Sequence, residues 1–161
     1  MIDSSMNKVL IALDYDPTSE KIAKTGYSMA KAMGAEIVLL TIYTDQAQLN
    51  PTLYDPIIGY NGFMEIDVAN EEKNDKLKKA AEDFLEKTKS YLGDTNIKTM
   101  VKEGDYSKTI LKTANDIKAD IIVLGSHSKK WLEKILLGST TEKVLKETSL
   151  PLLIVPTKKK H

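Results

Sequence analysis

The stretch Ile121-Ile122-Val123-Leu124-Gly125 is the most strand-like part of the chain. Four apolar residues in a row, without polar alternation, are typical of a strand that is buried on both faces of a parallel sheet. Residues 9–13 have the same character, and residues 37–43 and 152–155 are similar. Residues 97–101 form a weaker, alternating run, which is typical of an edge strand. Together these segments predict a parallel sheet of five strands.

Helical patterns lie between the predicted strands. Ser19 can act as the N-cap of a helix whose apolar residues recur until Gly34, and Asp105 can cap another. We predict a long amphipathic helix over 66–92 and a short helix over 139–148. Strands and helices therefore alternate, which predicts an α/β fold, a three-layer α/β/α sandwich. The expected strand order is 3-2-1-4-5, with the two most apolar runs as central neighbours.

The length of 161 residues suits one domain, which we place over 1–156, followed by a flexible lysine-rich tail over 157–161. Between the second strand and the long helix, residues 44–65 show no regular pattern and contain two prolines and two glycines. Such a long loop either carries function or an interface, or is a variable surface insertion. The last strand is flanked by Pro151 and Pro156, so we expect it at a sheet edge.

The composition excludes several classes of protein. Lysine and the acidic residues both number 23, arginine is absent, and the formal net charge is zero, which argues against a nucleic-acid partner. There is no cysteine, and hence no disulfide or thiolate chemistry. Neither a signal peptide nor an apolar run of about 20 residues is present, so we expect a cytoplasmic protein without a membrane partner.

In open parallel sheets, ligands bind beyond the carboxyl ends of the strands. Asp14 follows the first strand and Gly125 ends the fourth, so we expect them to form the walls of a crevice. The helix that begins near Ser139 would contribute backbone N–H groups and a partial positive charge, which suit a phosphate. Ser139 with Glu142 also fits a capping box, which needs no ligand.

The segment from Gly125 to Ser139 resembles the nucleotide loop of the universal stress protein family, written G-x2-G-x9-G-[ST]. Gly125 and Gly138 match the outer glycines, and Ser139 matches the hydroxyl residue. Ser128 stands where the pattern has its second glycine. If the backbone there needs a positive φ, serine is strained; if only a small side chain is needed, serine is compatible. The resemblance covers essentially the whole chain.

The resemblance implies a binding site for ATP, or for AMP or ADP, in a stress-response regulatory protein without a dedicated catalytic centre. It assigns the base and ribose to Asp14 and to the backbone at Ala12, Leu13 and Ile42. The residues that would surround ribose and phosphates are Gly125, Ser126, His127, Ser128, Lys129, Gly138, Ser139, Thr140 and Thr141. Asp14 or Asp16 could reach a phosphate-bound Mg²⁺ through water, although we favour simple turn-forming aspartates. The resemblance also implies a homodimer joined through residues 152–155.

Two alternatives stay open: a dimeric interaction domain that binds no nucleotide, and a weak ATP hydrolase. His127 is a candidate catalyst, but no cysteine and no serine–acid partner accompanies it, so we favour a donor to phosphate. Unrelated nucleotide-binding classes fit poorly, because neither G-x-G-x-x-G nor a P-loop follows the first strand. A receiver domain would need an aspartate after the third strand, where Val101-Lys102-Glu103-Gly104 stands.

Overall fold

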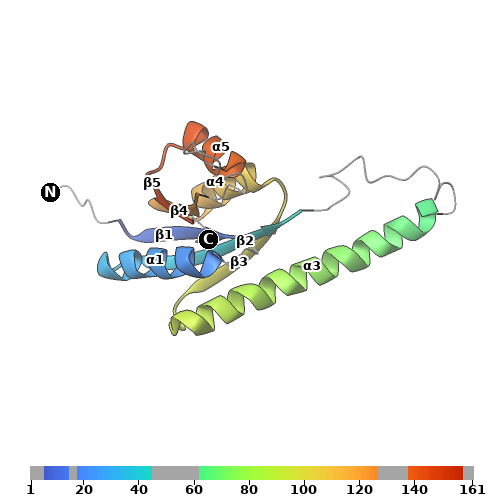
Figure 1. Ribbon diagram of the computed structural model, residues 1–161, viewed down its shortest axis with the longest axis horizontal. Helices are drawn as coiled ribbons and strands as arrows, with labels where there is room; N and C mark the ends of the chain where they lie inside the picture. The colour runs from blue at the N-terminus through green and yellow to red at the C-terminus, as the bar shows by residue number, and fades with distance from the viewer. Residues whose placement is uncertain (1–5, 15–17, 45–61, 127–137, 158–161) are drawn as a thin grey trace.

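The computed structural model describes residues 6–14, 18–44, 62–126 and 138–157. Within these ranges five strands alternate with four helices (Figure 1). In chain order the elements are β1 (Lys8–Leu13), α1 (Ser19–Ala32), β2 (Glu36–Tyr43), α3 (Gly62–Leu92), β3 (Lys98–Glu103), α4 (Tyr106–Asp116), β4 (Ile121–Gly125), α5 (Ser139–Glu147) and β5 (Leu152–Val155).

The five strands form one parallel sheet in the order β3-β2-β1-β4-β5, which confirms the predicted α/β fold and strand order. The most apolar runs, β1 and β4, are neighbours at the centre, with Val9 aligned to Ile121 and Ile11 to Val123. The alternating run forms the edge strand β3, and the proline-flanked run forms the opposite edge, β5. Because all strands are parallel, their carboxyl ends lie on one side of the sheet.

Helices cover both faces of the sheet (Figure 1). On one face Ile11 and its neighbours pack with Ile22 of α1 and Leu85 of α3. On the other face Leu10 and its neighbours pack with Ile110 of α4 and Val144 of α5. Successive residues of a strand point to opposite faces, so a continuous apolar run is needed to fill both cores.

Two helix starts differ from the predictions, and a third helix has another residue at its cap position. Ser19 is the first residue of α1 rather than its cap, and the preceding Thr18 makes no side-chain capping bond. Helix α3 begins at Gly62, four residues before its predicted start, and extends well beyond the sheet (Figure 1). Helix α5 begins at Ser139, as predicted, but Gly138 rather than Ser139 is at its cap position. The Asp105 cap is confirmed: its Oδ1 accepts from the Lys108 backbone N–H at 3.0 Å.

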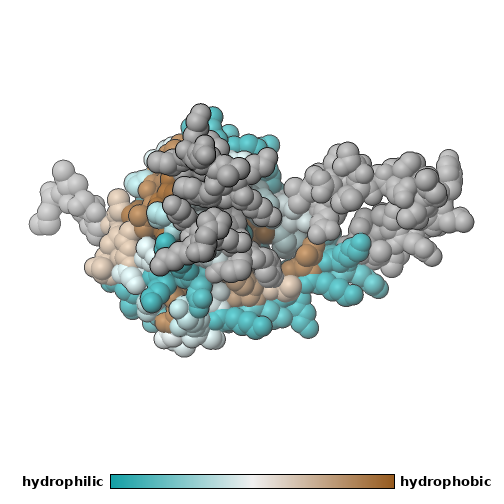
Figure 2. Space-filling view, in the orientation of Figure 1, coloured by the Kyte–Doolittle hydropathy of each residue, from teal (hydrophilic) through white to brown (hydrophobic). Residues whose placement is uncertain are grey.

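Apolar and polar side chains are unevenly spread over the surface. Figure 2 shows hydrophilic residues along the outer side of α3, and apolar residues on the side of the molecule where Figure 1 places β5. Among the described helices, none combines the length and apolarity that a bilayer crossing requires.

Candidate functional site

A cavity of about 330 Å³ opens at the carboxyl ends of the strands. It lies between the ends of β1, β2 and β4 and the first turns of α4 and α5. The structure brings nine of the thirteen predicted site residues together around this cavity. They are Ala12, Leu13, Asp14, Ile42, Gly125, Gly138, Ser139, Thr140 and Thr141.

One end of the cavity is apolar. Leu40 and Ile42 of β2 line it together with Ile110 of α4 and Leu124 of β4, and all four side chains belong to the core cluster of that face. Tyr106, the first residue of α4, also lines this end. Such walls suit a flat, uncharged ring system, since a charged group placed there would lose its hydration without compensation.

The backbone of Ile42 supplies hydrogen-bonding groups to this apolar end. The Tyr43 carbonyl accepts from the Gly104 N–H at 3.1 Å, so Tyr43 directs its backbone groups toward β3. Consecutive strand residues direct these groups to alternate sides, and the N–H and carbonyl of Ile42 therefore face the β1 side. Strand β1 ends at Leu13, which is aligned with Thr41, the residue before Ile42. Ile42 thus faces the space just beyond β1.

The other end of the cavity is formed by the first turn of α5. The first backbone bond of this helix runs from the Glu142 N–H to the Gly138 carbonyl at 2.9 Å, and no side chain of the described residues caps its start. The N–H groups of Ser139, Thr140 and Thr141 therefore have no acceptor within the helix. The predicted capping box is wrong, because the Glu142 carboxylate pairs instead with Lys146 at 3.1 Å. Free N–H groups and the helix dipole together favour an anion.

Thr141 has a structural role that the sequence did not indicate. Its buried hydroxyl donates to the Gly125 carbonyl at 2.9 Å, tying the first turn of α5 to the end of β4. The hydroxyl proton is therefore already engaged, and the hydroxyls of Ser139 and Thr140 are the ones available to a ligand. Thr141 fixes the distance between the two segments that the nucleotide-loop pattern connects.

Packing gives one reason for a glycine at position 125, in addition to its place in the lining of the cavity. A Cβ at this position would lie 2.3 Å from Cδ1 of Ile22 and 3.1 Å from Cγ2 of Thr157. A side chain here would force Ile22 of α1 and Thr157 to move. The first glycine of the motif thus allows α1 to lie close against the end of β4.

Ser126 does not line the cavity in the described structure. It is buried, its N–H donates to the Val155 carbonyl at 2.9 Å, and its Oγ accepts from the Thr157 N–H at 3.2 Å. Ser126 therefore joins β4 to the segment after β5. Thr157 itself is buried and hydrogen-bonded, so the packed part of the chain includes the first residue of the predicted tail. The predicted site residues His127, Ser128 and Lys129 lie outside the described residues, as does Asp16.

The fold and this geometry agree with a match to known proteins. The model of the Universal stress protein family matches residues 6–156. The chain belongs to the universal stress protein family. Universal stress protein MJ0577 of Methanocaldococcus jannaschii is 32% identical over 155 residues, which cover 94% of this chain and 95% of the relative.

Solved universal stress protein structures share the fold. A structure of MJ0577 aligns with a TM-score of 0.71 and 28% identity, covering 97% of this chain and 99% of the other. A universal stress protein solved in complex with cAMP aligns with a TM-score of 0.61 and 22% identity, covering 96% and 100%. The architecture of this family member is therefore that of its solved relatives.

Sequence reasoning missed part of the lining of the cavity in this universal stress protein. Leu40, Ile110 and Leu124 line it through side chains that also belong to the core, and Ile22 reaches it from α1. Tyr106 was also missed, and it differs from these four buried residues because 37% of its surface is exposed. The sequence places Tyr106 directly after the Asp105 cap, near the carboxyl end of the third strand. Because the carboxyl ends of the strands face the crevice, this position could have indicated a lining residue.

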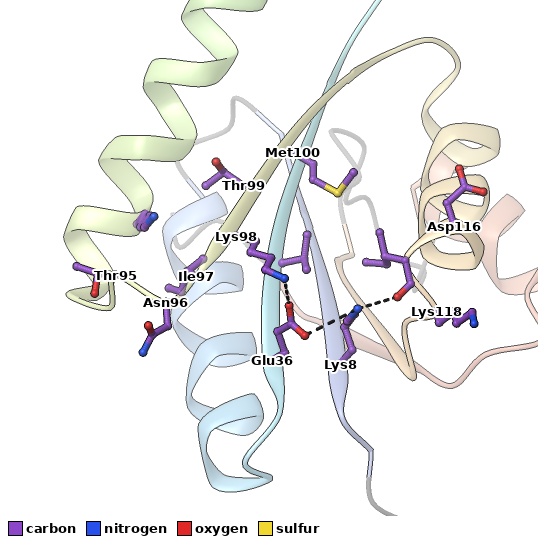
Figure 3. Close-up of a pocket in the computed structure, with 13 residues that line it drawn as sticks. Lys8, Glu36, Thr95, Asn96, Ile97, Lys98, Thr99, Met100, Asp116 and Lys118 are labelled. Carbon is purple, nitrogen blue, oxygen red and sulfur yellow. Dashed lines mark hydrogen bonds and ion pairs between the residues drawn. The ribbon is translucent and has the colours of Figure 1, made fainter.

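A second and larger hollow, of about 760 Å³, lies at the opposite, amino ends of the strands (Figure 3). Here Glu36 is placed between two lysines, with Lys98 Nζ at 2.6 Å and Lys8 Nζ at 3.8 Å from its carboxylate oxygens. Lys8 Nζ also donates to the Ile117 carbonyl at 2.9 Å. These ion pairs and the hydrogen bond link the amino ends of β1, β2 and β3 to the end of α4.

The pKa of the Glu36 carboxyl reflects this arrangement. The hydrogen bond from Lys98 holds the pKa of Glu36 below its usual value of 4.5, against the opposing effect of desolvation, and Lys8 lowers it further. Near the carboxyl ends, the pKa of the Asp105 carboxyl is also lowered, first by the Lys108 N–H and then by Ser107. The Asp105 cap is thus held as a carboxylate at neutral pH.

Proposed function

We propose that this universal stress protein binds an adenine nucleotide, ATP or its mono- or diphosphate, in the carboxyl-end cavity and acts as a regulatory protein rather than an enzyme. One observation carries the proposal: a single cavity joins an apolar slot to the uncapped first turn of α5. A nucleotide has the same division, with a flat apolar base at one end and phosphates at the other.

The parts of the ligand can be assigned to parts of the cavity. The base lies between β2 and α4, where the Ile42 N–H and carbonyl can pair with ring nitrogens and an exocyclic amine. The phosphates lie at the N–H groups of Ser139, Thr140 and Thr141 and the hydroxyls of Ser139 and Thr140. Asp14, at the end of β1, lines the cavity between these two ends and suits the ribose hydroxyls. A Mg²⁺ ion, if bound, would be held through the phosphates.

The cAMP complex of a universal stress protein with the same fold supports an adenine nucleotide as the class of ligand. Cyclic and linear nucleotides share the base and ribose and differ at the phosphate. Titration with ATP, ADP, AMP and cAMP, each with and without Mg²⁺, identifies the preferred ligand.

The decisive experiment is calorimetric titration of the wild type and of Gly138→Asp. Aspartate is a favourable N-cap residue, so the variant should fold at least as well as the wild type. Its carboxylate would occupy the free N–H groups and repel phosphate, and we expect ATP affinity to fall by about 100-fold or more. Gly93→Asp places the same carboxylate in open space at the end of α3, at a φ of +70° that costs some stability, and should leave the affinity of the folded protein unchanged. Absence of saturable wild-type binding at millimolar ATP would exclude the proposal and leave an interaction domain.

The wild type and Gly138→Asp also distinguish a regulatory role from ATP hydrolysis. We expect wild-type protein incubated with ATP to release no more ADP than Gly138→Asp does. Steady ADP release that is lost in Gly138→Asp would identify a weak ATP hydrolase instead.

We further propose that the protein forms a symmetric homodimer through the β5 edge. Leu152, Leu153 and Ile154 are only half-buried on this edge strand, and Figure 2 shows apolar residues on this side of the molecule. Unpaired edge strands recruit a second chain readily. Light scattering at tens of micromolar should give a dimer, and Ile154→Lys should give a monomer. A monomeric wild type at that concentration would contradict this interface.

A further inference from the structure

We propose that Tyr106 is the residue that selects a purine base in this cavity, by placing its ring against the face or edge of the base. The inference rests on the proposed nucleotide binding and goes beyond it, because it names the side chain that determines the specificity for the base. The apolar end of the cavity has aliphatic walls on the sheet side, and Tyr106 is its aromatic member in the described structure.

The neighbouring backbone fixes Tyr106 in place. Gly104 has a φ of +144°, a conformation that other residues rarely adopt, and its N–H donates to the Tyr43 carbonyl at 3.1 Å. Asp105 then caps α4, accepting from both the Lys108 N–H and the Ser107 hydroxyl at 3.0 Å. The turn is thus tied to the end of β2 on one side and to α4 on the other, and Tyr106 is held beside Ile42.

The Tyr106 side chain is available for a ligand. It is one of the few large hydrophobic side chains that are exposed in the described parts of the chain. The other lining residues Leu40, Ile110 and Leu124 are buried in the core. No hydrogen bond to its hydroxyl occurs among the described residues. Within the described parts of the chain, an exposed ring that lines an apolar cavity is placed to contact a ligand.

The ring should contribute more to purines than to pyrimidines. Stacking between a base and an aromatic side chain grows with the overlapping area and does not depend on hydrogen-bond pattern. A two-ring base offers more overlap than a single ring. Purine preference therefore follows from the aromatic wall, and the choice of adenine among the purines follows from the Ile42 backbone.

Calorimetric titration with ATP and CTP tests the inference. Tyr106→Ala should weaken ATP binding about tenfold and CTP binding about threefold, so that the preference for ATP narrows. Tyr106→Phe keeps the ring and should bind both nucleotides like the wild type. Tyr91→Ala removes an even more exposed tyrosine from α3, away from the cavity, and should change neither affinity.

Smaller ligands separate the two ends of the site. Adenosine binding should fall in Tyr106→Ala, whereas binding of ribose 5-phosphate should not. If the wild type binds ATP and Tyr106→Ala binds ATP and CTP with unchanged affinities, the inference is wrong and the proposed function stands. If the wild type binds no nucleotide, both are wrong. Thermal unfolding of each variant shows whether a lost affinity reflects a lost fold.

Discussion

The two ends of the sheet differ in how completely their polar groups are paired. At the amino ends, Lys8, Glu36 and Lys98 form a connected group across three strands, and the Asp120 carboxylate accepts from the Asn7 and Lys8 backbone N–H groups. At the carboxyl ends, Gly138 is at the cap position of α5, and no side chain among the residues that the structure describes caps its first turn. The amino-end hollow is the larger, about 760 against 330 Å³.

This difference indicates that unsatisfied hydrogen-bonding capacity, rather than volume, distinguishes the proposed binding site. A hollow whose charges already pair with one another gains little from a ligand, which would have to replace those pairs. Three N–H groups without an acceptor in their own helix can bind an anion without breaking an existing ion pair. Substitutions at the amino ends should therefore change stability alone, and those at the carboxyl ends should change both stability and nucleotide affinity.

The largest effect on stability is expected for Gly125→Ala. Its Cβ would meet Ile22 Cδ1 at 2.3 Å, so the Ile22 side chain must shift within the core, and overpacking of this kind costs up to about 3 kcal/mol. Ile22→Val removes that methyl group. The double variant should therefore lose less stability than the sum of the two single variants in chemical unfolding. Strict additivity would show that Ile22 is not the contact that requires a glycine.

Asp120→Ala should cost about 2 kcal/mol, because two backbone N–H groups lose a charged acceptor at the partly exposed start of β1. Asp120→Asn keeps one acceptor oxygen and should retain part of this stability. Both variants should bind ATP with wild-type affinity once folded. A reduced affinity in calorimetry would mean that the amino ends are coupled to the site.

Thr141→Val should cost about 1 kcal/mol, since it removes the hydroxyl that donates to the Gly125 carbonyl while preserving shape. We expect ATP affinity to fall a few-fold, because the first turn of α5 loses its attachment to β4. Thr141→Ser retains the donor and serves as the control. An affinity that is equal in the valine and serine variants would contradict the positioning role of this bond.

The smallest effect is expected for Glu36→Gln, and it should depend on pH. The pKa of Glu36 is lowered by folding, chiefly by the Lys98 hydrogen bond, so its charged form stabilises the folded state above about pH 4.5. This contribution is lost as the pH falls through the lowered pKa. The difference in unfolding free energy between wild type and variant should be present at pH 7, shrink below pH 4.5, and diminish with added salt. A difference that is independent of pH would show that the carboxylate charge is not involved.

Most of the fold could be predicted from the sequence because the relevant signals are local. Continuous apolar runs such as residues 121–124 identify buried strands, and the weaker run in β3 and the prolines beside β5 identify edges. Helix starts were less certain. Both Ser19 and Ser139 are plausible caps by type, yet each is the first residue inside its helix, since φ and ψ rather than residue type decide the cap position.

The site was predictable in position and less so in the role of each residue. The carboxyl-end rule and the motif brought Asp14, Ile42 and the α5 start to one cavity. The reason for Gly125 depends on Ile22, more than 100 residues earlier, and the position of Ser126 depends on Thr157. Such long-range packing leaves no local pattern. Tyr106 was missed because an exposed tyrosine after a cap is common.

Amide chemical shifts recorded during titration with ATP test the central claim most directly. The account predicts that the largest changes fall on the N–H groups of Ser139, Thr140 and Thr141 and on Ile42, with Lys8, Glu36 and Lys98 nearly unchanged. Changes concentrated at the amino-end residues, or spread evenly over both ends, would contradict it.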